Sequence, residues 1–322
     1  MAGKLAVVFG GSGFVGRNVV RELAARGWRV RVAVRRPHHA QFLRPMGAVG
    51  QIQLVQANLR HQQSVAKAQE GADAVVNCVG ILFQAGAQKF SSVQEGGAAT
   101  LARLASEAGV TNYLHVSAIG ADAESDSLYA QTKAAAEKAV LEEIPTAKIV
   151  RPSIVFGPED QFFNRFAEMA KMSPALPLIG GGGTKFQPVY VDDVADVICA
   201  LLEGNGEQQI YELGGPRVYT FKELLQYMLE VIDHKRLLAP LPFAIAPLVG
   251  LAGEIAGVLP FLDPPITRDQ IKLLKKDNVV NTDDPAIGTF ETLGITPKSV
   301  EAIVPEYLGR FRKYGEFSER VA

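Results

Sequence analysis

An apolar run that ends in a cluster of glycines constrains this chain more than any other feature. Residues 5–9 are all apolar, and an amphipathic pattern runs from residue 14 to residue 26. Four glycines stand between these segments or at the start of the second: Gly10, Gly11, Gly13 and Gly16. This order predicts a buried strand, a tight turn and a helix.

The spacing of the glycines predicts a turn that binds a dinucleotide. They fit G-x-x-G-x-x-G from Gly10 and G-x-G-x-x-G from Gly11, so the register stays open by one residue. In either register one glycine permits the turn, one lets the backbone approach a pyrophosphate, and one lets the helix pack closely on the strand. The free N–H groups and positive dipole of the helix N-terminus favour phosphates. The expected cofactor-binding residues here are Gly10, Gly11, Ser12, Gly13, Phe14, Val15 and Gly16. An ordinary turn between strand and helix is the alternative.

Apolar strands and helical segments alternate along the first half of the chain. The expected strands are 29–34, 52–56, 74–79 and 113–117, and the expected helices start near 62, 91 and 128. This alternation predicts an α/β fold with a doubly wound parallel sheet and helices on both faces. We expect a dinucleotide-binding domain over 1–157 and a smaller lobe over 158–322, with about 188–213 returning to the sheet.

Two arginines follow the second expected strand, where a dinucleotide fold places the adenosine ribose. An acidic residue there binds the 2′-hydroxyl of NAD, whereas an arginine accepts the 2′-phosphate of NADP. Arg35 and Arg36 therefore predict NADP(H), although two solvated charges before a loop would give the same sequence. Other residues expected against the cofactor follow the third and fourth strands: Asn58, Leu59, Val79 and Gly80.

Tyr129 and Lys133 stand four residues apart in the expected helix 128–143, so they share one helical face. A nearby ammonium favours a phenolate and is expected to lower the phenol pKa, which suits acid/base chemistry. Ser117, at the end of the fifth strand, can bring a hydroxyl to the same crevice. A Tyr–Lys pair on a helix is also common as plain surface decoration.

These features together resemble the extended and atypical short-chain dehydrogenases/reductases, and the resemblance covers most of the chain. Its motifs are the glycine cluster, Ser117, Tyr129-x-x-x-Lys133, and Arg151-Pro-Ser-Ile-Val-Phe-Gly157. A narrower match looks like the branch that contains the nucleotide-binding accessory subunit of respiratory complex I, NADH:ubiquinone oxidoreductase. Its segments are FGPEDQFFNRF at 156–166, QPVYVDD at 187–193 and PITRDQ at 265–270.

The resemblance implies roles for individual residues. Ser117, Tyr129 and Lys133 match the catalytic set of the family. The stretch Pro152, Ser153, Ile154 and Val155 is expected against the nicotinamide, with a loop of a substrate lobe as the alternative and Arg151 then only an ion-pair partner. In the complex I branch the subunit holds NADP(H) and lies against the peripheral arm, near the membrane and the quinone channel, while other relatives are implicated in coenzyme Q synthesis.

Three functional hypotheses follow. In the first, the chain is an accessory or assembly subunit of complex I with a structural or regulatory nucleotide. In the second, it is an NADP-dependent reductase or dehydrogenase for an apolar, quinone-related substrate. The third and weaker hypothesis is a redox sensor that changes partners when NADP(H) binds.

Composition excludes several other classes of protein. The net charge of −1 provides no basic field for nucleic acid. The two cysteines, Cys78 and Cys199, lie in apolar segments and are expected to be small core residues rather than ligands or a disulfide. No metal site is expected. Only four residues precede the first strand, which leaves no room for a targeting peptide, so we expect a cytoplasmic protein, peripheral on the cytoplasmic or matrix-equivalent face of the inner membrane.

Three features of the second half carry further expectations. Gly180–Gly183 is expected to be a flexible or hairpin connection rather than a phosphate loop, and Asp192 and Asp193 are expected to cap a helix over 194–202. Residues 237–253 contain no charged side chain, and only Glu254 interrupts the apolar stretch to 262. Its prolines and glycines argue against a single spanning helix. Core of the smaller lobe and an exposed surface for a membrane or partner stay open as alternatives.

Overall fold

The apolar run at the start of the chain forms β1 (Leu5–Phe9), whose five residues are all buried in an eight-stranded sheet. The computed structural model describes residues 3–86, 88–256, 266–313 and 315. The chain divides into two compact units. The first contains residues 1–152, 191–213 and 281–295, and the second contains 153–190, 214–280 and 296–322.

The sheet of the first unit is parallel at every pairing, in the order β14-β11-β6-β5-β4-β1-β2-β3. Its other strands are β2 (Arg29–Val34), β3 (Ile52–Gln56), β4 (Ala74–Asn77), β5 (Tyr113–Val116), β6 (Lys148–Pro152), β11 (Ile210–Leu213) and β14 (Ile287–Gly288). The chain leaves β1 toward β2 and β3 and later returns to β4 on the other side of β1. A reversal of strand order of this kind opens a crevice at the carboxyl ends of the strands.

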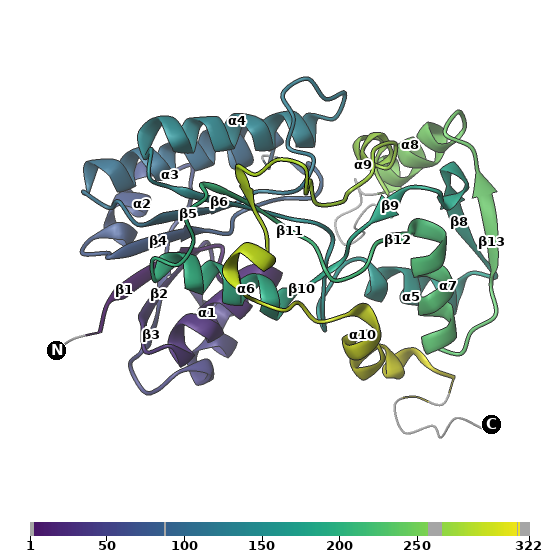
Figure 1. Ribbon diagram of the computed structural model, residues 1–322, viewed down its shortest axis with the longest axis horizontal. Helices are drawn as coiled ribbons and strands as arrows, with labels where there is room; N and C mark the ends of the chain where they lie inside the picture. The colour runs from purple at the N-terminus through teal and green to yellow at the C-terminus, as the bar shows by residue number, and fades with distance from the viewer. Residues whose placement is uncertain (1–2, 87, 257–265, 314, 316–322) are drawn as a thin grey trace. The chain divides into compact units, whose positions relative to one another are not determined.

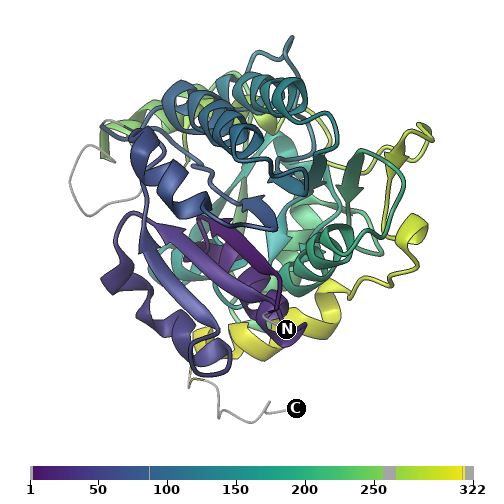
Figure 2. The ribbon, with the colours of Figure 1, turned by 90° about the vertical axis from the view of Figure 1, so that its left-hand side faces the viewer.

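Helices cover both faces of this sheet. Figure 1 shows α2, α3 and α4 on one face and α1 and α6 on the other, and Figure 2 shows the layers from the side of the first strands. The helices are α1 (Phe14–Ala25), α2 (Gln62–Gln69), α3 (Gly96–Glu107), α4 (Leu128–Glu143) and α6 (Val191–Leu202). Shorter turns are η1 (Pro37–Met46), the π-helical η2 (Ser91–Glu95) and η4 (Glu291–Leu293). Alanines of α3 and α4 pack closely on the sheet in a buried core with Val7, Val75 and Ile149. The predicted doubly wound parallel fold is confirmed.

Two expectations from the sequence differ from the observed structure of the first unit. Residues 281–295, expected in the smaller lobe, add β14 to the edge of the sheet, beside β11. Asp192 and Asp193 do not precede their helix but lie in its first turn, because α6 begins at Val191. Asp192 forms an ion pair with Arg21 of α1, so it helps to join two helices on the same face.

An ion triad joins α4 to the sheet inside the first unit. Arg151 of β6 donates to both carboxylate oxygens of Glu137, at 2.9 and 2.6 Å, and lies 3.4 Å from a carboxylate oxygen of Glu212 in β11. Both glutamates are buried. The alternative interpretation of Arg151 as an ion-pair partner thus describes its observed contacts.

The second unit consists of short strand pairs and helices around its own core. The pairs are β7 (Val155–Phe156) with β10 (Val189–Tyr190), β8 (Ala175–Ile179) with β13 (Leu237–Leu241), and β9 (Lys185–Phe186) with β12 (Tyr219–Thr220). The helices are α5 (Phe163–Met172), α7 (Phe221–Val231), α8 (Ala246–Ala256), α9 (Arg268–Leu273) and α10 (Val300–Leu308), with the turns η3 (Gly180–Gly182) and η5 (Gly309–Phe311).

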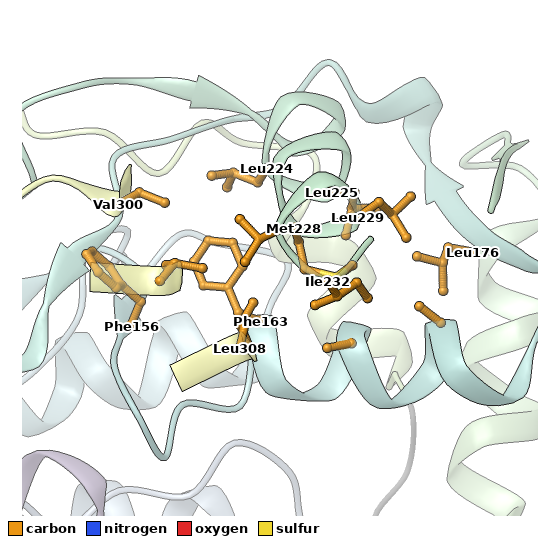
Figure 3. Packing of buried hydrophobic residues seen from close by; sticks show 14 of the residues in the cluster. Phe156, Phe163, Leu176, Leu224, Leu225, Met228, Leu229, Ile232, Val300 and Leu308 are labelled. Atoms are coloured by element: carbon orange, nitrogen blue, oxygen red, sulfur yellow. The ribbon is translucent and has the colours of Figure 1, made fainter. Parts of the chain in front are cut away.

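The core of this unit is centred on α7. Figure 3 shows Leu224, Leu225, Met228 and Leu229 of this helix among Phe156, Phe163 and residues of α10. A capping box starts the helix, because Thr220 Oγ1 accepts from the Glu223 N–H while the Glu223 carboxylate accepts from the Thr220 N–H. The glycine run at 180–183 connects β8 to β9, which belong to different strand pairs, so it is not a hairpin turn.

Candidate functional site

A cavity of about 230 Å³ opens in the first unit where β1, β2, β3 and β4 end. Four strand ends and the segment after β4 line it: Phe9, Gly10, Ser12, Gly13, Ala33, Val34, Arg35, Ala57, Asn58, Leu59, Arg60, Cys78, Val79, Gly80, Ile81, Gln88, Ser92 and Val93. This is the crevice that the strand order creates. A nucleotide is therefore the ligand that its position favours.

The glycine turn forms one wall of the cavity. Gly10 has φ +76°, and the N–H of Gly13 donates to the Gly10 carbonyl at 2.9 Å. A Cβ on Gly16 would lie 2.3 Å from the Gly10 carbonyl oxygen, and one on Gly10 would lie 3.0 Å from the Cys78 backbone. A Cβ on Gly11 would lie 2.7 Å from Val32 Cγ1, so glycine is required at this position too, and the register stays open between the two motifs.

Only some of the predicted cofactor-binding residues line the cavity. Asn58, Leu59, Val79 and Gly80 line the cavity, as do Gly10, Ser12, Gly13 and Arg35. Gly11, Phe14, Val15, Gly16 and Arg36 belong to the same segments but are not among the lining residues. Pro152 ends β6, and Ser153, Ile154 and Val155 belong to the second unit. The nicotinamide contact expected for this stretch stays a prediction.

Sequence reasoning missed several lining residues. Arg60 follows β3 and adds a second guanidinium to a wall where Arg36 was expected. Gln88 reaches the cavity from the segment after β4, and its Oε1 accepts a hydrogen bond from Arg35 Nη1 at 2.9 Å. Cys78, expected in the core, also lines the cavity, whereas Cys199 is fully buried as predicted. No local pattern marks Gln88, which lies far beyond the end of β4. The one signal for Arg60 is its position as a charged residue shortly after a predicted strand.

The predicted catalytic residues lie in the same unit, close to this cavity. The ammonium of Lys133 lies 5.9 Å from the centroid of the Tyr129 ring, which confirms that the two share one face of α4. Lys133 Nζ donates to the Val116 carbonyl at 3.0 Å. A Cβ on Gly80, which lines the cavity, would lie 3.7 Å from the same Nζ atom. Ser117 follows directly on β5 and is buried, and its hydroxyl has no hydrogen-bond partner among the residues that the structure describes.

The pKa values of Tyr129 and Lys133 correct one expectation. Burial raises the pKa of Tyr129 to about 12, so Lys133 does not produce a phenolate near neutral pH. Burial lowers the pKa of Lys133 to about 8, against the opposing effects of Glu137 and Cys78. Desolvation by burial is the largest effect on the pKa of each group. The phenol of Tyr129 is therefore protonated near neutral pH.

A buried amide and imidazole support the strand end beside the cavity. Asn77 Oδ1 accepts from the Val79 N–H at 3.0 Å, and its Nδ2 lies 3.0 Å from Nδ1 of His115. Burial, with a further contribution from Lys133, lowers the pKa of His115 to about 3, so the ring is neutral. Its Nε2 has no partner in the described part of the chain. The pair fixes the backbone that carries Val79 into the cavity wall.

The second unit exposes apolar side chains between β13 and α8. The exposed fractions are 68% for Leu237, 50% for Ile245, 67% for Leu248 and 39% for Leu251. The two alternatives for the segment 237–262 each hold in part. Ala246 is buried in a small core with Ile179 and Ile271, whereas the four side chains above are exposed. The last residues of the segment, from 257, lie outside the described part. Within the described residues, no helix is long and apolar enough to cross a membrane, and no cluster of three potential metal ligands occurs.

Comparisons with known proteins agree with this geometry. Residues 6–214 match the model of the NAD dependent epimerase/dehydratase family. The mitochondrial NADH dehydrogenase (ubiquinone) 1 alpha subcomplex subunit 9 of Arabidopsis thaliana is 36% identical over 323 residues, which cover 98% of this chain and 80% of the relative. A ceramide reductase of Caulobacter vibrioides is 30% identical and covers 74% of each chain. A dTDP-glucose 4,6-dehydratase of Streptomyces venezuelae has the same fold, with a TM-score of 0.71 at 21% identity over 94% of this chain and 95% of that one.

The lowered pKa of Lys133 predicts a pH effect on stability. Between about pH 8 and 10.5 unfolding of the wild type takes up a proton at this lysine, so its contribution to the free energy of unfolding rises with pH. We expect Lys133→Met to lose this rise, in total roughly 3 kcal/mol. Cys78 and Tyr129, whose pKa values are raised, contribute the opposite slope in both proteins. Because Lys133 lowers the pKa of Cys78, the difference between the two proteins reports Lys133 together with its effect on that thiol. Urea unfolding followed by the fluorescence of buried Trp28 measures it.

Lys138 of the same helix provides the control, because 78% of its side chain is exposed. Lys138→Met should retain the wild-type dependence on pH. Identical slopes for Lys133→Met and the wild type would contradict the prediction.

Proposed function

Because the chain belongs to the NAD dependent epimerase/dehydratase family, we propose that it holds NADP(H) as an accessory subunit of respiratory complex I. The observation that carries the proposal is the similarity to the Arabidopsis subunit along 98% of the chain. The family model ends at residue 214, whereas this similarity extends through most of the second unit. The partners that the proposal names are other subunits of the same complex.

The residues of the first unit fit a dinucleotide. The glycine turn offers backbone N–H groups at the start of α1, and the cavity is lined mainly by glycines and apolar side chains with a few polar side chains. Arg35 supports the choice of NADP(H), because a guanidinium presents a fork of charged donors to a 2′-phosphate. Arg60 lines the same wall and adds to the positive charge.

A second function is supported by Ser117, Tyr129 and Lys133. The chain would then be a reductase or dehydrogenase for an apolar, quinone-related substrate, and the ceramide reductase relative supports this alternative. Bound NADPH would supply a hydride. Tyr129, protonated at neutral pH, would donate its phenolic proton to a substrate oxygen, the hydroxyl of Ser117 would orient that oxygen, and Lys133 would hold the ribose.

The exposed apolar surface supports a peripheral position on a membrane, on its cytoplasmic or matrix-equivalent face. This surface is defined here by Leu237, Ile245, Leu248, Val249 and Leu251. Exposed cations stand before it, at Lys235, and on or after the packed helix α9, at Lys272, Lys275 and Lys276. An apolar face bordered by cations is complementary to an anionic lipid surface.

The cofactor proposal is tested by titration. The wild type is expected to bind NADPH more tightly than NADH, and Arg35→Ala should lose roughly tenfold or more of that preference, since a charge-assisted hydrogen bond contributes about 1.5–3 kcal/mol. Arg36→Ala should lose less, because Arg36 is not among the residues that line the cavity. Equal affinities of the wild type for the two cofactors would contradict the proposal.

Tyr129→Phe distinguishes the accessory subunit from the enzyme. The substitution removes the proton-bearing oxygen and little volume, so the nucleotide should stay bound. If the chain is an accessory subunit, complex I isolated from cells with only the variant should contain it in wild-type amount and oxidise NADH at the wild-type rate. Loss of complex activity with nucleotide binding intact would favour a catalytic role instead.

The membrane proposal is tested with the double substitution Leu248→Ser and Leu251→Ser. Because both side chains are exposed, thermal stability should stay close to that of the wild type. Flotation with phosphatidylglycerol vesicles should carry the wild type and leave the variant behind. Phe42→Ser is the control, since Phe42 is exposed in the first unit, outside the apolar surface. Equal flotation of the wild type and the double variant would contradict membrane docking.

A further inference from the structure

Gln88 holds the guanidinium of Arg35 at the cavity wall. Its Oε1 accepts from Arg35 Nη1 at 2.9 Å, and both side chains line the cavity although 53 residues separate them in sequence. We infer that Gln88 is a positioning residue that makes the site selective for a 2′-phosphorylated dinucleotide. This inference rests on the proposed function, because it specifies how Arg35 would recognise the phosphate.

The backbone around Gln88 is fixed by local hydrogen bonds. The N–H of Ala85 donates to the Gln88 carbonyl at 3.1 Å, and the N–H of Gln88 donates to the Ala85 carbonyl at 2.9 Å. Gln84 Oε1 accepts from the Phe90 N–H at 3.1 Å, so a hydrogen bond joins the two ends of the short segment that contains Gln88. Gln88 therefore reaches Arg35 from a small folded structure rather than from an extended loop.

The same segment is attached to α4, close to Tyr129. Gln94 is buried, its Nε2 donates to the Ile81 carbonyl at 2.7 Å, and its Oε1 accepts from Thr132 Oγ1 at 2.9 Å. The ring of Phe90 contacts the ring of Tyr129 edge to face, with centroids 5.8 Å apart. These contacts fix both ends of the segment, so the position of Gln88 is set by the fold of the first unit.

The chemistry of an amide suits this position. A neutral amide oxygen orients a guanidinium by accepting one N–H, and it leaves the positive charge and the remaining donors available for a phosphate. A carboxylate at the same place would neutralise Arg35, repel a phosphate and accept from a ribose 2′-hydroxyl, as acidic residues do in NAD sites. We therefore expect glutamine at position 88 to favour NADP(H) and glutamate at this position to favour NAD(H).

Arg31 and Gln53 provide a matched pair elsewhere in the same unit. Arg31 Nε donates to Gln53 Oε1 at 3.3 Å, between β2 and β3, and neither residue lines the cavity. A substitution at Gln53 changes the same kind of contact without reaching the nucleotide. It therefore controls for general effects of charge and stability.

The experiment measures the dissociation constants of NADPH and NADH for the wild type, Gln88→Ala, Gln88→Glu, Gln53→Glu and Arg35→Ala. Fluorescence of the reduced nicotinamide reports binding, and circular dichroism checks that each variant is folded. We expect Gln88→Ala to weaken NADPH about tenfold and leave NADH unchanged, as loss of one charged contact predicts. Gln88→Glu should weaken NADPH further, strengthen NADH and invert the preference. Gln53→Glu should match the wild type.

Two results would overturn the inference alone. If Arg35→Ala abolishes the preference for NADPH while both Gln88 variants retain it, Gln88 does not position Arg35. If Gln88→Ala binds NADPH more tightly than the wild type, Gln88 competes with the phosphate instead of preparing its site. If Arg35→Ala retains the preference, the result contradicts the proposed cofactor site as well.

Discussion

The close approach of backbone to backbone at the first turn is the constraint on which the nucleotide site depends. A Cβ on Gly16 would lie 2.3 Å from the Gly10 carbonyl oxygen, a distance that no side chain can adopt. Glycine at this position lets α1 start directly against the end of β1, and glycine at position 10 lets the turn lie against the backbone after β4. Because β1 lies between β2 and β4 in the sheet, the same contact opens the cavity at the reversal of strand order. The sequence carries this constraint visibly, since nothing except glycine satisfies it.

Most of the first unit could be predicted because its signals are local. Strands β1, β2 and β3 have the expected bounds, since β1 is a short apolar run ended by glycine and β2 and β3 are short segments in which apolar and polar residues mix before a polar loop. Helix α4 starts and ends where its pattern does. The features that the sequence did not predict depend on contacts between segments that are far apart in the chain. Strand β14 has only two residues and joins the sheet by pairing with β11, far away in sequence, so no periodicity marks it. Gln88 and Arg60 acquire their importance only when separate strands bring their ends together.

The pKa values could not be predicted from spacing because they depend on burial. The four-residue separation of Tyr129 and Lys133 correctly placed them on one face, but an attraction between them was expected to control the phenol. The desolvation of each group is the larger effect, so both pKa values move toward the neutral forms. One turn further along α4, Glu137 favours the charged lysine, yet it is itself engaged by Arg151, which is shared with Glu212. The ion triad therefore joins α4 to β6 and β11, while Glu137 offsets only part of the desolvation of Lys133.

The buried ammonium also bears on the choice between a catalytic and a structural nucleotide. Lys133 donates to the Val116 carbonyl, whereas an ammonium has three donors. Burial of the charged ammonium is costly, as the lowered pKa of Lys133 indicates. Ribose hydroxyls can accept the remaining hydrogen bonds, so a bound nucleotide would offset the cost of burial and stabilise the first unit by mass action. That gain requires no reaction. A fold that uses its nucleotide as a structural element therefore has a physical reason to keep the lysine of a catalytic pair, and the presence of Tyr129 and Lys133 alone does not imply turnover.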